Sequence, residues 1–169
     1  MINRAMASPT TRYILLGLAA LSLVGLGWSF YGIISAQFQA SWQNALEIAG
    51  ERYLSALQDV ETGYRGYINV GTDDFLEPYI QARSNYDRYV TALKEAAANT
   101  EISAEIPARL IATGEKILAF GEQVIAARKR SFDEAQALVK TREGKFAMDQ
   151  IREDLHAVEG WSQHEREAI

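Results

Sequence analysis

The sequence predicts an all-α protein: an N-terminal transmembrane helix that continues into an antiparallel, up-down-up-down four-helix bundle. Apolar residues recur at intervals of three and four through most of the chain, which is the period of one helix face. Only 3 of the 169 residues are Pro, and good helix formers such as Ala, Leu, Glu, Gln and Arg are abundant. One segment near the N-terminus is apolar for long enough to cross a bilayer.

The composition excludes several classes of function. The 17 Lys and Arg are outnumbered by 22 Asp and Glu, so the chain has no basic excess for binding nucleic acid. It has no Cys, which excludes disulfides, thiolate zinc sites and iron–sulfur clusters. His156, Glu159 and His164 are too few to predict a metal site and fit a solvated helix face. Phosphate-binding and nucleophile motifs are also missing, so we expect no catalytic residue, no cofactor and no metal.

The predicted transmembrane helix covers residues 13–35. A hydrocarbon core of about 30 Å needs roughly 20 apolar residues, which this segment supplies. Trp28, Phe30 and Tyr31 lie toward one end of it, as interfacial aromatics do. A cleaved signal peptide is the alternative interpretation. Its apolar core is usually about 7 to 15 residues long, so the greater length here favours an uncleaved anchor.

The charges predict the orientation of this helix. Arg4 and Arg12 precede it, whereas every Asp and Glu of the chain lies at or beyond Glu47. The positive-inside rule therefore places residues 1–12 in the cytoplasm. Residues 37–169 are then predicted to be the extracytoplasmic domain, periplasmic in a bacterium, with a single span of the inner membrane in this chain.

The first bundle helix is expected to continue the transmembrane helix without a break to about Ile68. Asn69 and Gly71 end it, and a second helix follows, capped by Thr72 and ending near Asn99. The inward residues of the first helix are Phe38, Trp42, Ala45, Ala49, Tyr53, Leu57 and Val60. Those of the second are Leu76, Tyr79, Tyr86, Val90 and Leu93.

A third helix is predicted to begin between about Ser103 and Pro107, and a fourth long helix to open at Gly144. A short helix between them starts at Ser131, which has the Ser-x-x-Glu form of a capping box, and extends to Val139. The basic run 128–130 suits the dipole at the end of the third helix. The inward residues of the two long helices are Leu110, Ile111, Ile117, Leu118, Val124, Ile125, Met148, Ile151, Leu155 and Val158.

Short turns make consecutive helices antiparallel, which gives the bundle its up-down-up-down topology. At about 1.5 Å per residue, the four bundle segments have similar lengths of roughly 36 to 46 Å. The fourth helix therefore brings Ile169 back toward the membrane. We expect the chain to be a fragment of a longer protein in which a second transmembrane helix and a cytoplasmic module follow.

Two separated sequence blocks carry further information. The first signature block is Glu61-Thr62-Gly63-Tyr64-Arg65-Gly66-Tyr67, followed by Gly71, Phe75-Leu76 and Pro78-Tyr79. The second signature block is Gly144-Lys145, Met148-Asp149 and Ile151-Arg152, followed by Glu165. Together they resemble the third class of CHASE domains, the cyclase/histidine-kinase-associated sensory extracellular domains, over about residues 38–169.

This resemblance implies an extracytoplasmic helical sensor of a bacterial transmembrane signalling receptor. The parent protein would be a sensor histidine kinase of a two-component system, a diguanylate or adenylate cyclase, or a chemoreceptor. The resemblance does not choose among these outputs. It also implies that the receptor acts as a dimer.

The residues of the two blocks also predict a polar cluster. Glu61 and Arg65 are spaced for an ion pair on one helix face, and the rise per residue puts Asp149 and Arg152 of the fourth helix at a similar height. The cluster has two interpretations. It is either a structural pin that fixes helix register, which we favour because buried charges commonly do this, or a ligand site.

Other residues of the first block have expected roles in packing. Gly63 and Gly66 each cost about 1 kcal/mol relative to Ala in a helix interior, so we expect them to permit the close approach of another helix. Tyr64, Tyr67 and Tyr79 are expected to be core aromatics with a polar tip, with stacking on a ligand as the alternative.

Two classes of function remain open. The first is a sensor, acting as a homodimer, in which a shift between the first and fourth helices passes across the bilayer when a small ligand or a periplasmic protein binds. The second is a membrane-anchored periplasmic binding or scaffold protein without an output. An apolar span soon after Ile169 would indicate the sensor, whereas a stop codon there would indicate the scaffold.

Overall fold

The computed structural model describes the backbone of residues 9–167, and side chains from residue 13 onward except those of Gln39 and Arg166. Most of the predicted cytoplasmic segment 1–12 therefore lies outside the described residues. Every element in the described part is helical, which confirms the predicted all-α fold class. The elements are α1 (Pro9–Val70), the 3₁₀ helix η1 (Asp73–Leu76), α2 (Glu77–Ala98), α3 (Glu105–Arg130), α4 (Phe132–Lys140) and α5 (Glu143–Glu167).

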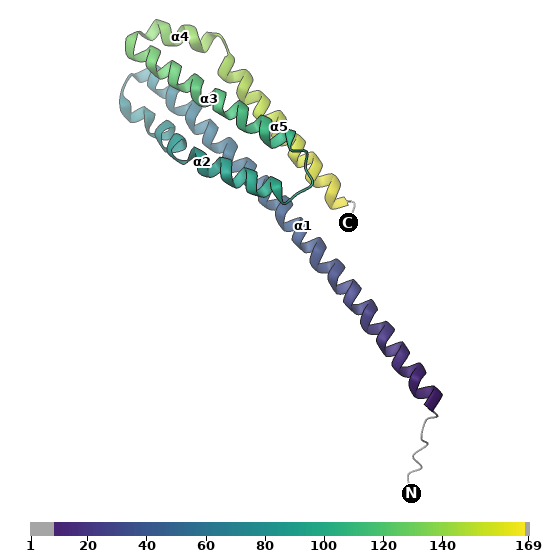
Figure 1. Ribbon diagram of the computed structural model, residues 1–169. Helices are drawn as coiled ribbons and strands as arrows, with labels where there is room; N and C mark the ends of the chain where they lie inside the picture. Colours follow the sequence, from purple (N-terminus) through teal and green to yellow (C-terminus); the bar gives the residue numbers. More distant parts are fainter. Residues whose placement is uncertain (1–8, 168–169) are drawn as a thin grey trace. The chain divides into compact units, whose positions relative to one another are not determined.

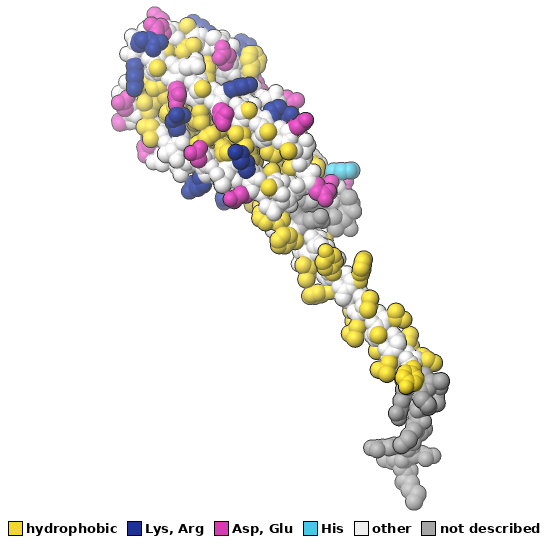
Figure 2. All heavy atoms as spheres, in the orientation of Figure 1, with side chains coloured by type: hydrophobic (Ala, Val, Ile, Leu, Met, Phe, Trp, Pro, Cys, Tyr) yellow, Lys and Arg dark blue, Asp and Glu magenta, His cyan; other side chains and the backbone are white. Residues whose placement is uncertain are grey.

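The chain divides into two compact units, Met1–Gln39 and Ala40–Ile169. The described part of the first unit is the apolar beginning of α1, and its side chains from Tyr13 to Ile34 are exposed. By length and composition α1 can cross a membrane: a window of 18 residues has a mean hydropathy of 1.8, and none of that window is buried. Figure 2 shows hydrophobic side chains along this unit, whereas charged side chains gather on the second unit.

The second unit is the helical bundle. The part of α1 that follows Ala40 runs beside α2, α3 and α5, and these four segments alternate in direction (Figure 1). The short helix α4 connects α3 to α5 at the end where α1 terminates. The up-down-up-down arrangement is therefore present, with α4 as the short helix that the sequence predicts between the two long ones.

The buried core follows the predicted inward rows closely except at the start of the bundle part of α1, where Leu46 is buried although it was not predicted to be, and Trp42 and Ala45 are only partly buried. Leu46, Tyr53, Leu57, Leu93, Leu110, Ile117, Val124, Met148, Ile151 and Val158 are at most 1% exposed. Phe38, predicted to face inward, is instead 63% exposed, so that prediction is wrong. Its spacing continues the inward row, but it precedes Ala40, where the compact bundle unit begins, and the buried face of α1 starts only at Gln43.

The turns show why the helices end where they do. Gly71 has a φ of 85°, and its N–H donates to the Tyr67 carbonyl over 2.8 Å, which closes the end of α1 in a backbone conformation that favours glycine. Ser131 caps α4 as predicted, its hydroxyl accepting from the Asp133 N–H at 3.1 Å. Thr72 precedes η1 rather than α2, and its side chain makes no capping hydrogen bond, which corrects its predicted role.

Candidate functional site

The first signature block brings the end of α1 against the start of α2. A Cβ atom added to Gly63 would lie 2.7 Å from the Cβ atom of Tyr79, and one added to Gly66 would lie 2.9 Å from Cδ1 of Phe75. Both glycines therefore permit a backbone approach that Ala would block. Pro78 occupies the first turn of α2, where its missing N–H costs no helical hydrogen bond, and Leu76 is buried.

The second signature block meets the first through an apolar contact. The ring of Tyr64 packs edge-on against Phe120, with 5.9 Å between the ring centroids. A Cβ atom added to Gly144 would lie 2.9 Å from Cε1 of Phe120 and 2.9 Å from the Tyr64 hydroxyl oxygen. Burial raises the pKa of Tyr64 to about 12, with a smaller contribution from the Glu61 carboxylate. The two blocks thus meet as expected, but through aromatic rings and a glycine.

The expected polar cluster does not join the two helices. Arg65 donates to Glu61 within α1 at 2.9 Å. Asp149 pairs within α5, with Arg152 at 2.9 Å and with Lys145, whose hydrogen bond holds the pKa of Asp149 below its usual range. Among the described residues, no ion pair links the α1 pair to the α5 group. The Arg65 side chain is 61% exposed and those of Asp149 and Arg152 are 45% and 44% exposed, so these three face solvent, whereas the Glu61 side chain is 20% exposed.

This geometry predicts a small effect of removing Arg65. The Arg65 side chain is exposed and that of Glu61 is partly buried, so water still screens the pair, and such a pair contributes up to about 1 kcal/mol. We therefore expect Arg65→Ala to lower the free energy of unfolding by no more than about 1 kcal/mol. Urea titration of the detergent-solubilised chain, followed by circular dichroism, measures this. A loss of about 3 kcal/mol would instead indicate that Arg65 compensates a buried carboxylate.

A groove of about 800 Å³ lies beside the Glu61–Arg65 pair, between α1 and the segment formed by η1 and the start of α2. We call it the signature groove because residues of the first signature block line much of it. Its lining residues are Gln58, Glu61, Thr62, Arg65, Gly66, Asn69, Asp74, Phe75, Glu77 and Pro78. The groove is open and polar, with three carboxylates and one guanidinium.

An ion pair between a buried carboxylate and a half-exposed guanidinium links α3 to α5, and the sequence interpretation missed it. Asp154 is 1% exposed, and Arg109 Nε donates to both of its carboxylate oxygens, at 2.8 and 3.0 Å. Gln150 Nε2 donates to the same carboxylate at 3.2 Å. A signal for this site exists in the sequence: Asp154 follows the inward Ile151 by three residues and precedes the inward Val158 by four, so it shares their helix face.

A second missed feature is a buried tyrosine pair at the centre of the bundle. The hydroxyls of Tyr53 and Tyr86 are 2.7 Å apart, and they reach the carbonyls of Leu110 and Ile111 at 3.2 and 3.3 Å. Burial raises the pKa of both tyrosines, so their hydroxyls stay protonated. The pair rests against Gly114 of α3, where an added Cβ atom would lie 1.8 Å from the Tyr53 hydroxyl oxygen.

Arg128 of α3 forms a hydrogen bond to the end of α1. The sequence placed it in a basic run that suits the dipole of α3. Instead, its Nε donates to the Ile68 carbonyl at 2.8 Å, so it caps the C-terminal end of α1. A Cβ atom on Gly71 would lie 2.6 Å from Nη2 of Arg128, so this glycine leaves room for the cap.

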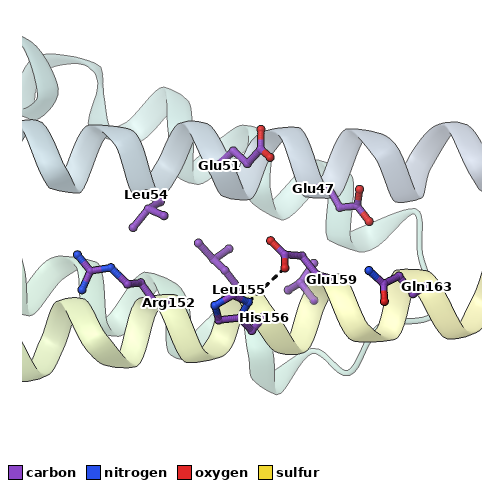
Figure 3. A pocket seen from close by; sticks show the side chains of 9 residues that line it. Glu47, Glu51, Leu54, Arg152, Leu155, His156, Glu159 and Gln163 are labelled. Carbon is purple, nitrogen blue, oxygen red and sulfur yellow. Dashed lines mark hydrogen bonds and ion pairs between the residues drawn. The ribbon is translucent and has the colours of Figure 1, made fainter.

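The helices α1 and α5 are in direct contact. A Cβ atom added to Gly50 would lie 2.7 Å from Cδ2 of Leu155. A groove of about 270 Å³ follows this contact, and Figure 3 shows Glu47 and Glu51 of α1 across from side chains of α5. Its lining residues are Glu47, Glu51, Leu54, Arg152, Leu155, His156, Val158, Glu159 and Gln163.

The histidine in this groove is paired at the surface. His156 Nδ1 lies 3.2 Å from Glu159 Oε2, and the His156 side chain is 77% exposed. Within the described residues, no group of three or more His, Asp or Glu side chains is placed to hold a metal ion. The paired His156 and Glu159 belong to the α5 side of this groove, and Glu47 and Glu51 line the α1 side.

Comparison with known proteins gives one match. The family model of the CHASE3 domain matches residues 43–167, which is most of the chain and includes both signature blocks. No curated protein and no solved structure matches it.

Proposed function

Because the chain belongs to the CHASE3 family of extracellular sensory domains associated with cyclases and histidine kinases, we propose that it is the sensor region of a bacterial membrane receptor. The first 12 residues lie in the cytoplasm, residues 13–35 cross the inner membrane, and residues 37–169 form the periplasmic sensor. This proposal rests on the continuity of α1, a single helix from Pro9 to Val70 that contains both the apolar segment and a core helix of the CHASE3 domain.

The signal is a displacement of α1 relative to α5. A continuous helix transmits movement along its axis, and packed helices move by about 1 to 2 Å between discrete arrangements. The contact of Gly50 with Leu155 holds the two helices together in the middle of the bundle. Two turns further toward Ala40, the buried polar atoms Gln43 Oε1 and Ser162 Oγ have no hydrogen-bond partner within the described residues. An unpaired buried polar group is unfavourable, so this layer supports a rearrangement of α1 against α5.

The output we propose is a histidine kinase, reached through a second membrane helix that follows α5. A diguanylate cyclase or a chemoreceptor is the alternative output for the same sensor. A membrane-anchored scaffold without output is the alternative from another class. The parent gene beyond Ile169 distinguishes them, because the sensor needs an apolar span and a cytoplasmic region there.

A reporter fusion tests the topology. Alkaline phosphatase fused after Gly144 should be active in cells and remain in the membrane fraction at full length, because the positive flank retains residues 1–12 in the cytoplasm. Replacing Arg4 and Arg12 with Glu should lower this activity. An active cytoplasmic reporter at the same position would reverse the proposed orientation, and a shortened soluble product would indicate a cleaved signal peptide.

We also propose that the receptor works as a homodimer. The small-residue rows Gly25/Ser29 and Gly32/Ala36 offer a face for close helix contact in the membrane. The native chain has no Cys, so single cysteines along residues 22–45 report on proximity without background. Disulfide-linked dimers should recur with a period near 3.6 residues. Uniformly absent cross-linking across this window would contradict the dimer.

The ion pair Glu61–Arg65 does not fix the register between helices, because both of its residues lie in α1. Glycine packing at Gly63 and Gly144 and the Arg109–Asp154 pair do that. We therefore propose that the exposed residues of the signature groove contact a ligand or a periplasmic protein. Two matched substitutions test this: Arg65→Ala lies in the signature groove and Lys129→Ala lies outside it. If both variants fold, loss of the signalling response in Arg65→Ala alone supports the proposed contact.

A further inference from the structure

A second groove lies between α3 and α5, on a face that the function proposed above does not use. It has a volume of about 460 Å³, and we call it the α3–α5 groove. Its lining residues are Thr113, Lys116, Ala119, Phe120 and Gln123 of α3, and Glu143, Gly144, Phe146, Ala147 and Gln150 of α5. The Gln150 side chain lines one end and donates to Asp154, so the Arg109–Asp154 pair supports that end.

The hollow arises from residue size. On α5 the facing positions are Gly144 and Ala147, and on α3 one of them is Ala119, so side chains do not fill the space between these helices. Phe120, 6% exposed, lines it from the core, and Phe146 lines it with a side chain that is 63% exposed. The groove therefore combines an apolar wall with access from solvent.

Two opposite charges in this groove have no partner. In the described part of the chain, neither Lys116 nor Glu143 forms an ion pair or a side-chain hydrogen bond. Neither has an opposite charge three or four residues away in its own helix. Several other charged side chains of the bundle are paired with a neighbour in the same helix, as in Glu61–Arg65 and Lys145–Asp149.

The two charges lie on opposing helices about one turn apart. Phe120 faces Gly144, and Lys116 lies one turn, about 6 Å, from Phe120 along α3. Glu143 is the neighbour of Gly144 at the start of α5. A small molecule that carries both an anionic and a cationic group can therefore reach Lys116 with one end and Glu143 with the other. The amide of Gln123 lines the same groove.

We propose that the α3–α5 groove binds a free α-amino acid with an apolar side chain. The ligand carboxylate pairs with the Lys116 ammonium, and the ligand ammonium pairs with the Glu143 carboxylate. The apolar side chain packs on Phe120 and Phe146. Cavities of this size, with an apolar wall and a few converging polar groups, are typical of small-molecule sites.

Binding at this groove would hold α5 against α3. Since α5 is one of the two helices that carry the proposed signal, the amino acid would change the position of α5 relative to α1. This consequence rests on the proposed function, whereas binding itself does not. A direct binding measurement therefore tests the site even if the proposed signalling is wrong.

The experiment is isothermal titration of the detergent-solubilised full chain with L-leucine and L-phenylalanine. Two one-ended analogues of leucine serve as matched probes: 4-methylpentanoate, which lacks the ammonium group, and 3-methylbutylamine, which lacks the carboxylate. We expect each analogue to bind at least about tenfold more weakly than leucine, because it loses one charge-assisted contact.

The variants Lys116→Gln and Glu143→Gln assign each contact. Lys116→Gln should lower the affinity for leucine at least about tenfold. It should leave the affinity for 3-methylbutylamine unchanged, since that analogue has no carboxylate to pair with Lys116. Glu143→Gln should lower the affinity for leucine but not the affinity for 4-methylpentanoate, which has no ammonium group. Lys94→Gln and Glu101→Gln, which change the same residue types outside the groove, should bind leucine as the native chain does. Circular dichroism of each variant controls for folding.

Three outcomes overturn the proposal. The first is no binding of leucine or phenylalanine up to about 10 mM. The second is equal binding of leucine and both one-ended analogues, which would indicate an apolar site without charge recognition. The third is leucine binding that Lys116→Gln leaves intact and Arg65→Ala removes, which would place the amino acid in the signature groove instead.

Discussion

Gly114→Ala is expected to lower the free energy of unfolding by about 3 kcal/mol or more. The added methyl group would lie 1.8 Å from the hydroxyl oxygen of Tyr53, 2.7 Å from its Cζ atom and 2.8 Å from the hydroxyl oxygen of Tyr86. Both rings are buried, so they cannot move aside without opening the core. Their displacement would also break the hydrogen bonds between the hydroxyls and to the carbonyls of α3. Urea titration of the solubilised chain measures the change.

Gly160→Ala is the matched control for this substitution. Gly160 also lies inside a helix, but nothing lies within 4 Å of a Cβ atom added there. Since Ala forms helices better than Gly by about 1 kcal/mol, Gly160→Ala should stabilise the bundle slightly. The same chemical change should therefore have opposite signs at the two positions. Stabilisation by Gly114→Ala would show that the tyrosine pair does not rest against α3 as described.

Arg109→Ala is expected to cause the second large loss of stability. Arg109 supplies the countercharge of Asp154, whose side chain is 2% exposed. Because the Arg109 side chain is 47% exposed, water screens part of the pair, and stranding the buried carboxylate costs about 2 kcal/mol. The remaining hydrogen bond from Gln150 to the carboxylate carries no full charge and cannot replace the guanidinium. Thermal and urea unfolding of the solubilised chain report this loss.

A double-mutant cycle separates the ion pair from simple loss of packing. Arg109→Ala combined with Asp154→Leu removes both charges and fills the buried position with an apolar side chain. The double variant should recover most of the stability that Arg109→Ala loses, because no charge remains buried. Equal losses in the single and double variants would mean that Asp154 is solvated in the native state.

Asp149 and Asp154 show what the helical period determines and what it leaves open. Asp149 and Asp154 are both acidic residues of α5, and the height of each along the helix follows from the rise per residue. They differ by about 140° around the helix axis, which decides that one faces solvent and the other the core. The inward row of Ile151 and Val158 includes Asp154, so the helical period places this carboxylate in the core, whereas its pairing with Arg109 of α3 depends on how the helices pack.

The contacts of two arginines differ in how far the sequence predicts them. Arg65 pairs with Glu61, four residues away, and sequence spacing alone predicted that contact. Arg128 reaches Ile68, which is far away in the sequence, because the end of α3 lies beside the end of α1. A long flexible side chain has several acceptors within reach, and only the positions of neighbouring helices select one of them.

By itself, the sequence determined the helices, their inward faces, the long apolar segment and the family. Each of these depends on local period, composition or a short motif, all of which are written along the chain. Only the tertiary structure decided which residue pairs with the buried Asp154, where the tyrosines meet, and that the signature blocks join through Tyr64, Phe120 and Gly144. These features depend on the rotation and spacing of packed helices, where a shift of one residue turns a side chain by about 100°.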